Sequence, residues 1–309
     1  MNTGIKYCEE RNYTEALRYA EASYDLQPMY GNIYIIGKAS YFLGQYERAY
    51  EMVDHLVKEN EYKVTECRFI RAHIYKKISK GWGSDFIEDV EYLLEKKINV
   101  DDLLYSFANA LKDSYHEEKR EKAFEVYKLC DQKGIEVLNT NWILASMYYK
   151  RGMWQKTIDS YKKAEEACDP NELVNYIGLP DHWKLGICWY NLGDLGSAYY
   201  CFRNGLPLDY SKTYPQSEEC LPTEEEEYIL YDCLEKSGDV ELLRYYKDEL
   251  YRRKRFLNGK MTAYDFYGER YDGVNYRYFY NDCLGKWDQE IVEYESIGTK
   301  LLRWIRQRQ

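Results

Sequence analysis

Small and aromatic residues recur along this chain at an interval of about 33 residues. The first set is Gly4, Tyr7, Tyr13 and Ala16, and the second is Gly37, Ser40, Tyr46 and Ala49. The same spacing returns at Ala145, Tyr148, Trp154 and Thr157, and again at Gly186, Trp189, Leu195 and Ala198. A repeat of this length is typical of helical hairpins that bury their apolar faces only against neighbouring hairpins. The pattern therefore predicts a chain of stacked helix pairs.

The repeated residues resemble the tetratricopeptide repeat. Gly37 with Ala49, and Gly186 with Ala198, stand at the family's small-residue positions, where the two helices of a pair cross closely. Trp189 stands at the aromatic position of the first helix. The resemblance implies an all-α, right-handed α-solenoid of about seven to eight antiparallel helix pairs with a C-terminal capping helix.

On this resemblance the whole chain, 1–309, forms a single solenoid domain. The repeats are clearest over 2–58, 140–168 and 182–206, are degenerate over 64–133 and 228–297, and end in a capping helix at 299–309. Asn12 is the expected N-cap of a helix that starts at Tyr13. The acidic segment 213–227, with the glutamates 224–227 at its end, is expected to be an exposed loop.

Composition restricts the class of protein. The net charge of -10 weighs against general binding to nucleic acid, which favours clustered Lys and Arg. The nine cysteines include no CxxC pair, which favours a reducing, intracellular setting, and we expect a cytoplasmic protein. No segment approaches the roughly 20 apolar residues of a membrane span, so we expect no membrane insertion.

The tetratricopeptide resemblance also implies that the first helix of each pair lines a concave groove. Aromatic side chains there would anchor a peptide, and lysines would pair with its acidic groups. The alternative for any one residue is packing between repeats or simple solvation. The expected partner-binding residues are Tyr34, Lys38, Tyr41, His73, Lys76, Trp142, Tyr149, Lys150, Trp183, Tyr190 and Asn191.

The sequence offers little support for catalysis. Its four histidines are not spaced with Cys or Glu as in metal sites, and the glycine-rich phosphate-binding and GxSxG motifs are absent. We therefore expect no enzyme activity, no metal and no cofactor. The basic cluster 252–255 fits either an anionic partner or a helix C-terminus.

The leading interpretation is a non-enzymatic scaffold that binds a protein or peptide partner, with an acidic peptide as the favoured ligand. Two alternatives stay open: an accessory protein of a glycosyltransferase system, and a scaffold subunit of a cell-cycle ubiquitin ligase. Ile5, Cys8 and Glu9 stand where co-chaperone members of the family carry their carboxylate clamp, so that role is not expected. The N-terminal edge is a candidate homodimer contact.

Overall fold

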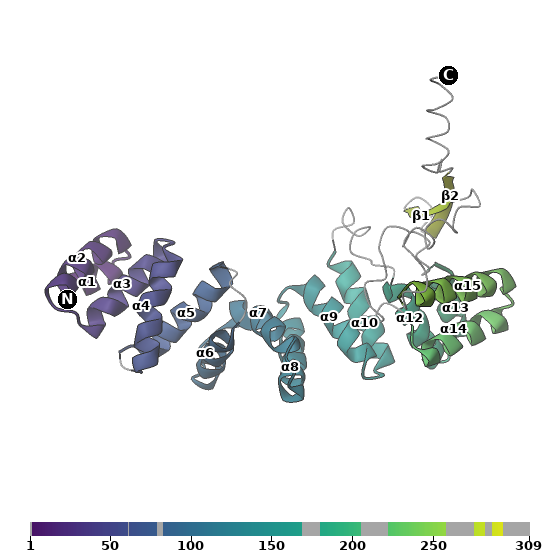
Figure 1. The fold of residues 1–309 in the computed structure, drawn as a ribbon, viewed down its shortest axis with the longest axis horizontal. Coiled ribbons are helices and arrows are strands. Elements are labelled where there is room, and N and C mark those ends of the chain that lie inside the picture. Colours follow the sequence, from purple (N-terminus) through teal and green to yellow (C-terminus); the bar gives the residue numbers. More distant parts are fainter. Residues whose placement is uncertain are drawn as a thin grey trace, which may run out of the picture. The chain divides into compact units, whose positions relative to one another are not determined.

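The computed structural model describes residues 2–60, 62–78, 83–168, 180–204, 222–257, 275–281 and 286–292. These residues form 14 helices and two strands, labelled along the chain in Figure 1. The helices are α1 Asn2–Glu9, α2 Tyr13–Leu26, α3 Tyr30–Phe42, α4 Tyr46–Glu59, α5 Val64–Ile78, α6 Ser84–Glu95, α7 Asp101–Lys112, α8 Glu117–Lys133, α9 Val137–Tyr149, α10 Trp154–Glu166, α12 Pro180–Asn191, α13 Leu195–Asn204, α14 Glu224–Ser237 and α15 Val240–Leu257. The strands are β1 Asn275–Asn281 and β2 Lys286–Val292. The helices follow one another in antiparallel pairs, which confirms the predicted solenoid of helix pairs.

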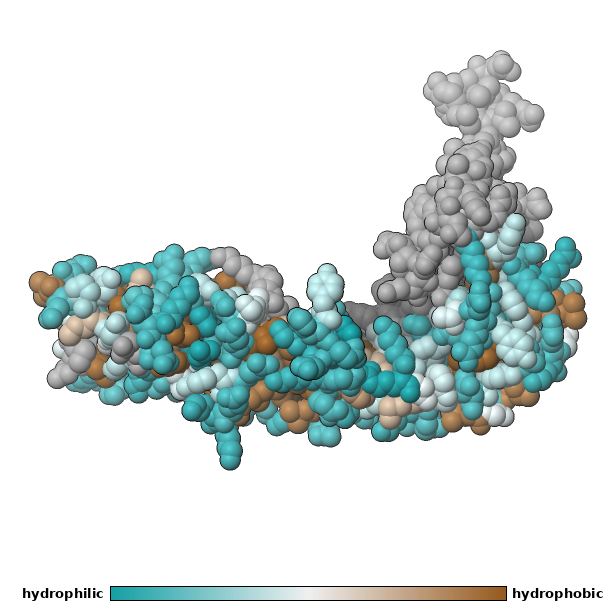
Figure 2. All heavy atoms as spheres, turned by 60° about the horizontal axis from the view of Figure 1, so that its bottom comes forward, coloured by the Kyte–Doolittle hydropathy of each residue, from teal (hydrophilic) through white to brown (hydrophobic). Residues whose placement is uncertain are grey.

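The chain divides into two compact units, an N-terminal unit of Met1–Leu144 and a C-terminal unit of Ala145–Gln309. In the N-terminal unit the first helices of successive pairs, α1, α3, α5 and α7, pack on one another in that order. In the C-terminal unit α12 packs on both α13 and α14. On the face drawn in Figure 2, hydrophobic side chains appear as separate patches between larger hydrophilic areas. The single-domain organisation stays a prediction.

Two helix crossings show why the repeat needs small residues. A Cβ atom placed on Gly37 of α3 would lie 2.9 Å from Val53 Cγ1 of α4. One placed on Gly186 of α12 would lie 2.4 Å from Cε1 of Phe202, which is fully buried in α13. Both distances are far below ordinary carbon contacts, so these helix pairs can approach only where the side chain is a hydrogen atom.

Helix starts follow local capping chemistry. The Asn12 side chain accepts a hydrogen bond of 3.3 Å from the backbone N–H of Glu15, which confirms Asn12 as the N-cap of α2. The glutamates 224–227 were expected in a loop, but they form the first turn of α14. There Thr223 and Glu226 make a reciprocal capping box, and negative charge is favourable at a helix N-terminus.

The core of the N-terminal unit contains a buried ion-pair network between α4, α5 and α6. Arg71 of α5 is 4% exposed and donates to both carboxylate oxygens of the fully buried Asp89 at 2.7 and 2.8 Å. It also donates to Asp54 of α4 at 2.5 Å. Arg68 adds a bond of 2.9 Å to Asp89. Because each buried charge has partners, the network ties three successive helices together.

The structure differs from the sequence expectation near the C-terminus, where a further degenerate helix pair was placed within 228–297. The strands β1 and β2 pair antiparallel there, with Asn275 opposite Val292 and Asn281 opposite Lys286. Tyr276, Tyr278 and Tyr280 alternate along β1, and aromatic residues with a period of two favour strands over helices. The expected capping helix at 299–309 lies outside the described residues.

Candidate functional site

The candidate site in the N-terminal unit is a row of side chains on the first helices of three successive pairs. We call it the α3–α5–α7 row. Its members are Tyr34, Lys38 and Tyr41 of α3, Phe69, His73 and Lys76 of α5, and Asp102, Tyr105 and Asn109 of α7. The five expected binding residues of this unit's second and third helix pairs are all among them.

Asp102 joins α5 to α7 within the row. Its Oδ2 lies 3.0 Å from His73 Nε2, and its backbone carbonyl accepts a hydrogen bond of 2.5 Å from Lys76 Nζ. His73 Nδ1 lies 2.8 Å from the Phe69 carbonyl oxygen. Both ring nitrogens therefore face oxygen atoms. Asp102 thus contacts both His73 and Lys76 of α5.

Tyr41 lies close to the same carboxylate. Burial raises the pKa of Tyr41, and the nearby Tyr46 and Asp102 raise it further. The Tyr41 ring also packs edge-on against Phe42 at 5.1 Å between centroids. The phenol is therefore a neutral hydroxyl at ordinary pH, available as a hydrogen-bond donor beside the His73–Asp102 pair.

Lys38 is the lysine of the row for which the described part of the chain provides no ion-pair partner. It is half-buried, and its Nζ lies 5.8 Å from the centroid of the Tyr34 ring. No carboxylate among the described residues lies within ion-pair distance of it. Tyr34 in turn packs edge-on against Tyr62 at 5.8 Å, and burial raises its pKa. The Cys8 thiol also lies near Lys38, whose charge partly offsets the rise that burial causes in the Cys8 pKa. A half-buried lysine beside an aromatic ring and a thiol is suited to receive an anionic group.

In the C-terminal unit two of the expected binding residues, Tyr149 and Tyr190, already bond to α14. The Tyr149 hydroxyl donates to Glu226, and the ring packs against Trp183 at 6.4 Å. Burial raises the pKa of Tyr149, and the bond to Glu226 raises it further. The Tyr190 hydroxyl donates to Asp232, which also pairs with Lys236 at 2.6 Å. Here acidic side chains of the chain itself take the places that a partner's acidic groups would fill.

The remaining expected residues are more scattered. Asn191 is exposed, and its side-chain amide donates to the Ile187 carbonyl at 2.9 Å. Lys150 is exposed, and Trp142 is half-buried in the part of α9 that belongs to the N-terminal unit. Trp142 and Trp183 thus belong to different units. Binding by any of these residues stays a prediction.

The sequence analysis missed the members of the row on α7. Tyr105 packs edge-on against Tyr127 at 6.2 Å, and the Tyr127 hydroxyl donates to Asn109 at 2.8 Å. A signal was present, because in five of the first helices an aromatic residue stands three positions before the small residue. The pairs are Tyr34 with Gly37, Phe69 with Ala72, Tyr105 with Ala108, Trp142 with Ala145, and Trp183 with Gly186.

Among the described residues, no group of three His, Cys, Asp or Glu side chains could hold a metal ion. Seven cysteines of this part of the chain are buried free thiols. None of the described helices is both long enough and apolar enough to cross a bilayer.

Comparison with known proteins finds similar solved structures, each at low sequence identity. No family model matches the sequence, and no curated protein matches it. The thermophilic TPR protein TTC0263 of Thermus thermophilus is similar to this chain with 17% identity and a TM-score of 0.28, covering 67% of this chain and 99% of its own. The TPR2AB domain of yeast Sti1, solved as a pHSP90 complex, is 16% identical with a TM-score of 0.33, and the match covers 81% of this chain and 95% of the Sti1 chain. The quorum sensor NprR of B. thuringiensis, in its apo form, is 15% identical with a TM-score of 0.36, and the match covers 86% of this chain and 84% of the NprR chain. Two of these three similar structures are TPR proteins or domains by name.

Proposed function

We propose that this chain is a protein-binding scaffold and that the α3–α5–α7 row receives an acidic peptide segment of its partner. The observation that carries the proposal is Lys38, which is half-buried beside Tyr34 and has no carboxylate within ion-pair distance among the described residues. A solenoid of stacked helix pairs offers such a row as an extended binding surface. Aromatic anchors and charge-assisted hydrogen bonds would supply the affinity.

The contacts within the C-terminal unit support the same chemistry. Glu226 and Asp232 of α14 bond Tyr149 and Tyr190 of the preceding first helices. Among the described residues of the row, the Tyr34 hydroxyl has no carboxylate hydrogen bond, and no carboxylate lies within ion-pair distance of Lys38. We therefore place the partner on the N-terminal unit and assign a structural role to Tyr149 and Tyr190. The homodimer contact at the N-terminal edge remains a separate prediction.

The test is a selection of random displayed peptides on the full chain, with removal of those that also bind the Lys38→Glu variant. We expect the retained peptides to be acidic and to bind the wild type at least about tenfold more tightly than Lys38→Glu. Lys6→Glu is the matched control, because its side chain is 72% exposed and its ion pair is to Glu10. Retained peptides without acidic residues, or an equal loss with Lys6→Glu, would contradict the proposal.

A further inference from the structure

The carboxylate of Asp102 occupies the polar groups of α5 within the α3–α5–α7 row. Asp102 stands in the first turn of α7, and its Oδ2 lies 3.0 Å from His73 Nε2 and 3.8 Å from Lys76 Nζ. Lys76 Nζ also donates to the backbone carbonyl of Asp102 at 2.5 Å. The charge of Lys76 is therefore already compensated by a carboxylate of the chain itself.

The neighbouring helix α3 differs at the equivalent place. Lys38 and His73 each stand one position after the small residue of their helix, which is Gly37 in α3 and Ala72 in α5. The two helices pack on one another. His73 faces Asp102, whereas the described part of the chain brings no carboxylate within ion-pair distance of Lys38. Of these two adjacent places, one is open to an anion and the other is filled.

The spacing of the helices relates this difference to the sequence of a bound peptide. Packed helices lie about 8–10 Å apart, and an extended peptide rises about 3.3 Å per residue. A peptide with an acidic residue at Lys38 therefore brings the residue three positions away to α5. A second acidic residue there would lose its hydration without gaining an ion pair, because Lys76 is already paired with Asp102.

We propose that Asp102 is a specificity-determining residue, which limits the ligand of the row to a peptide segment with one acidic residue, bound at Lys38. This inference rests on the proposed function of the row and narrows its ligand from acidic segments in general to singly acidic ones. Asp102 holds the place that a second acidic residue of the partner would take. Removing its carboxylate frees Lys76 and His73 for that second residue.

The test is a selection from displayed peptides of about nine residues, with glutamate fixed at the centre and random residues elsewhere. The full chain is used as wild type and as Asp102→Asn, and peptides that also bind the Lys38→Glu form of the same chain are removed. The measured quantity is the frequency of Asp and Glu three places before and three places after the fixed glutamate, relative to the input library. We expect no enrichment with the wild type and at least about fivefold enrichment on one side with Asp102→Asn.

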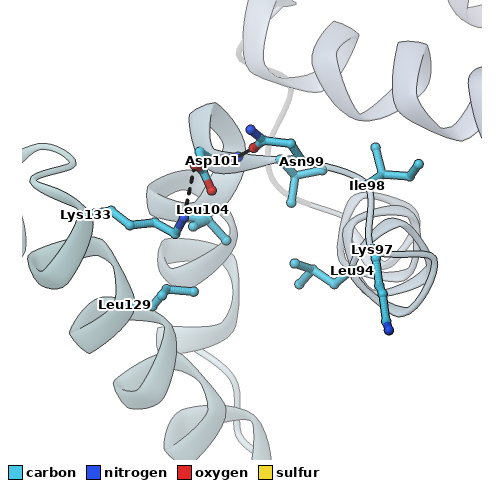
Figure 3. A pocket seen from close by; sticks show the side chains of 9 residues that line it. Leu94, Lys97, Ile98, Asn99, Asp101, Leu104, Leu129 and Lys133 are labelled. Carbon is cyan, nitrogen blue, oxygen red and sulfur yellow. Dashed lines mark hydrogen bonds and ion pairs between the residues drawn. The ribbon is translucent and has the colours of Figure 1, made fainter.

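The matched control is Asp101→Asn, which removes the same charge one position earlier on α7. Asp101 lines a cavity where α6, α7 and α8 meet, and it pairs with Lys133 of α8 at 3.1 Å, the dashed contact in Figure 3. Its side chain is 45% exposed, close to the 56% of Asp102. Asp101→Asn should give the wild-type frequencies, and so should Asp102→Glu, which keeps the carboxylate. Equal enrichment with Asp101→Asn and Asp102→Asn would refute the role of Asp102, because net charge alone would then explain it.

The remaining outcomes separate this inference from the proposed function. Peptides that depend on Lys38 but show the same acidic frequencies with wild type and Asp102→Asn would overturn the role of Asp102 and leave the proposed function standing. If no peptide depends on Lys38, the proposed function fails, and the role of Asp102 fails with it. Asp102→Asn keeps the backbone carbonyl that bonds Lys76, so its urea midpoint should stay close to that of the wild type.

Discussion

The crossing of α12 and α13 allows a quantitative test of the repeat architecture through Gly186→Ala. The new Cβ would lie 2.4, 2.7 and 2.8 Å from three carbons of the Phe202 ring. Ordinary carbon contacts begin near 3.5 Å, so the ring must withdraw by about 1 Å. Phe202 is fully buried, and its backbone carbonyl accepts a hydrogen bond of 2.6 Å from Tyr246, so the ring has little room to move.

Overpacking of this kind costs about 1–3 kcal/mol, while replacing a helical glycine by alanine returns up to about 1 kcal/mol. We expect Gly186→Ala to lower the free energy of unfolding by about 1–2 kcal/mol, and Gly186→Leu by at least about 3 kcal/mol. The matched control is Gly196→Ala in α13, where the nearest atom to the new Cβ is Asp194 Oδ1 at 3.5 Å. That change should be neutral or slightly stabilising.

The assay is urea denaturation followed by circular dichroism, with the transition midpoint and slope compared among variants. The double variant Gly186→Ala with Phe202→Leu should recover about 1 kcal/mol relative to the sum of the single changes, because the smaller side chain relieves the clash. The reasoning would be refuted by a Gly186→Ala chain at least as stable as Gly196→Ala.

Four further predictions concern stability and reactivity. Arg71→Met should lower the free energy of unfolding, measured by urea denaturation, by about 3–5 kcal/mol, because it leaves Asp89 buried without its bidentate partner. The surface control Arg18→Met should change the urea midpoint little. Thr223→Ala should remove the capping box with Glu226 and lower the stability of α14 by about 0.5–2 kcal/mol. The amides of α14 should then exchange faster, whereas the control Tyr228→Phe in the same helix should leave their exchange unchanged. Burial raises the pKa of four thiols strongly, so they should resist alkylation near neutral pH until the chain is unfolded. Peptide mass mapping checks this, and alkylation of these thiols in the native protein would contradict it. These thiols are Cys67, Cys188 and Cys201, with pKa raised to about 12, and Cys130, with pKa raised to about 11. Because the folded thiols hold their protons more tightly than the unfolded ones, stability should fall as the pH rises from about 9 towards 12, and a flat profile would refute the assignment.

Much of the helical architecture could be predicted because it follows from local rules. Gly37 and Gly186 mark close crossings, and Asn12 starts α2 by a bond to a residue three positions away. The start of α14 was missed although its signal is equally local, since Thr223 and Glu226 have the spacing of a capping box. The glutamate run was interpreted by charge alone, and the favourable interaction of negative charge with a helix N-terminus was overlooked.

The candidate site was only partly predictable, because the partner of a side chain on a first helix often comes from a distant part of the sequence. Tyr149 and Tyr190 bond acidic residues that are 77 and 42 positions away. Nothing in the local sequence around either tyrosine distinguishes it from Tyr34, which has no such bond.

The sequence by itself therefore determined the repeated helix pairs and the small residues at their crossings. These features depend on helical periodicity and on contacts within one pair. Only the tertiary structure decided that Lys38 has no described carboxylate within reach, that Asp102 joins α5 to α7, and that α6, α7 and α8 leave a cavity. The physical reason is that burial and charge pairing depend on which helices meet, and this is set by packing between repeats.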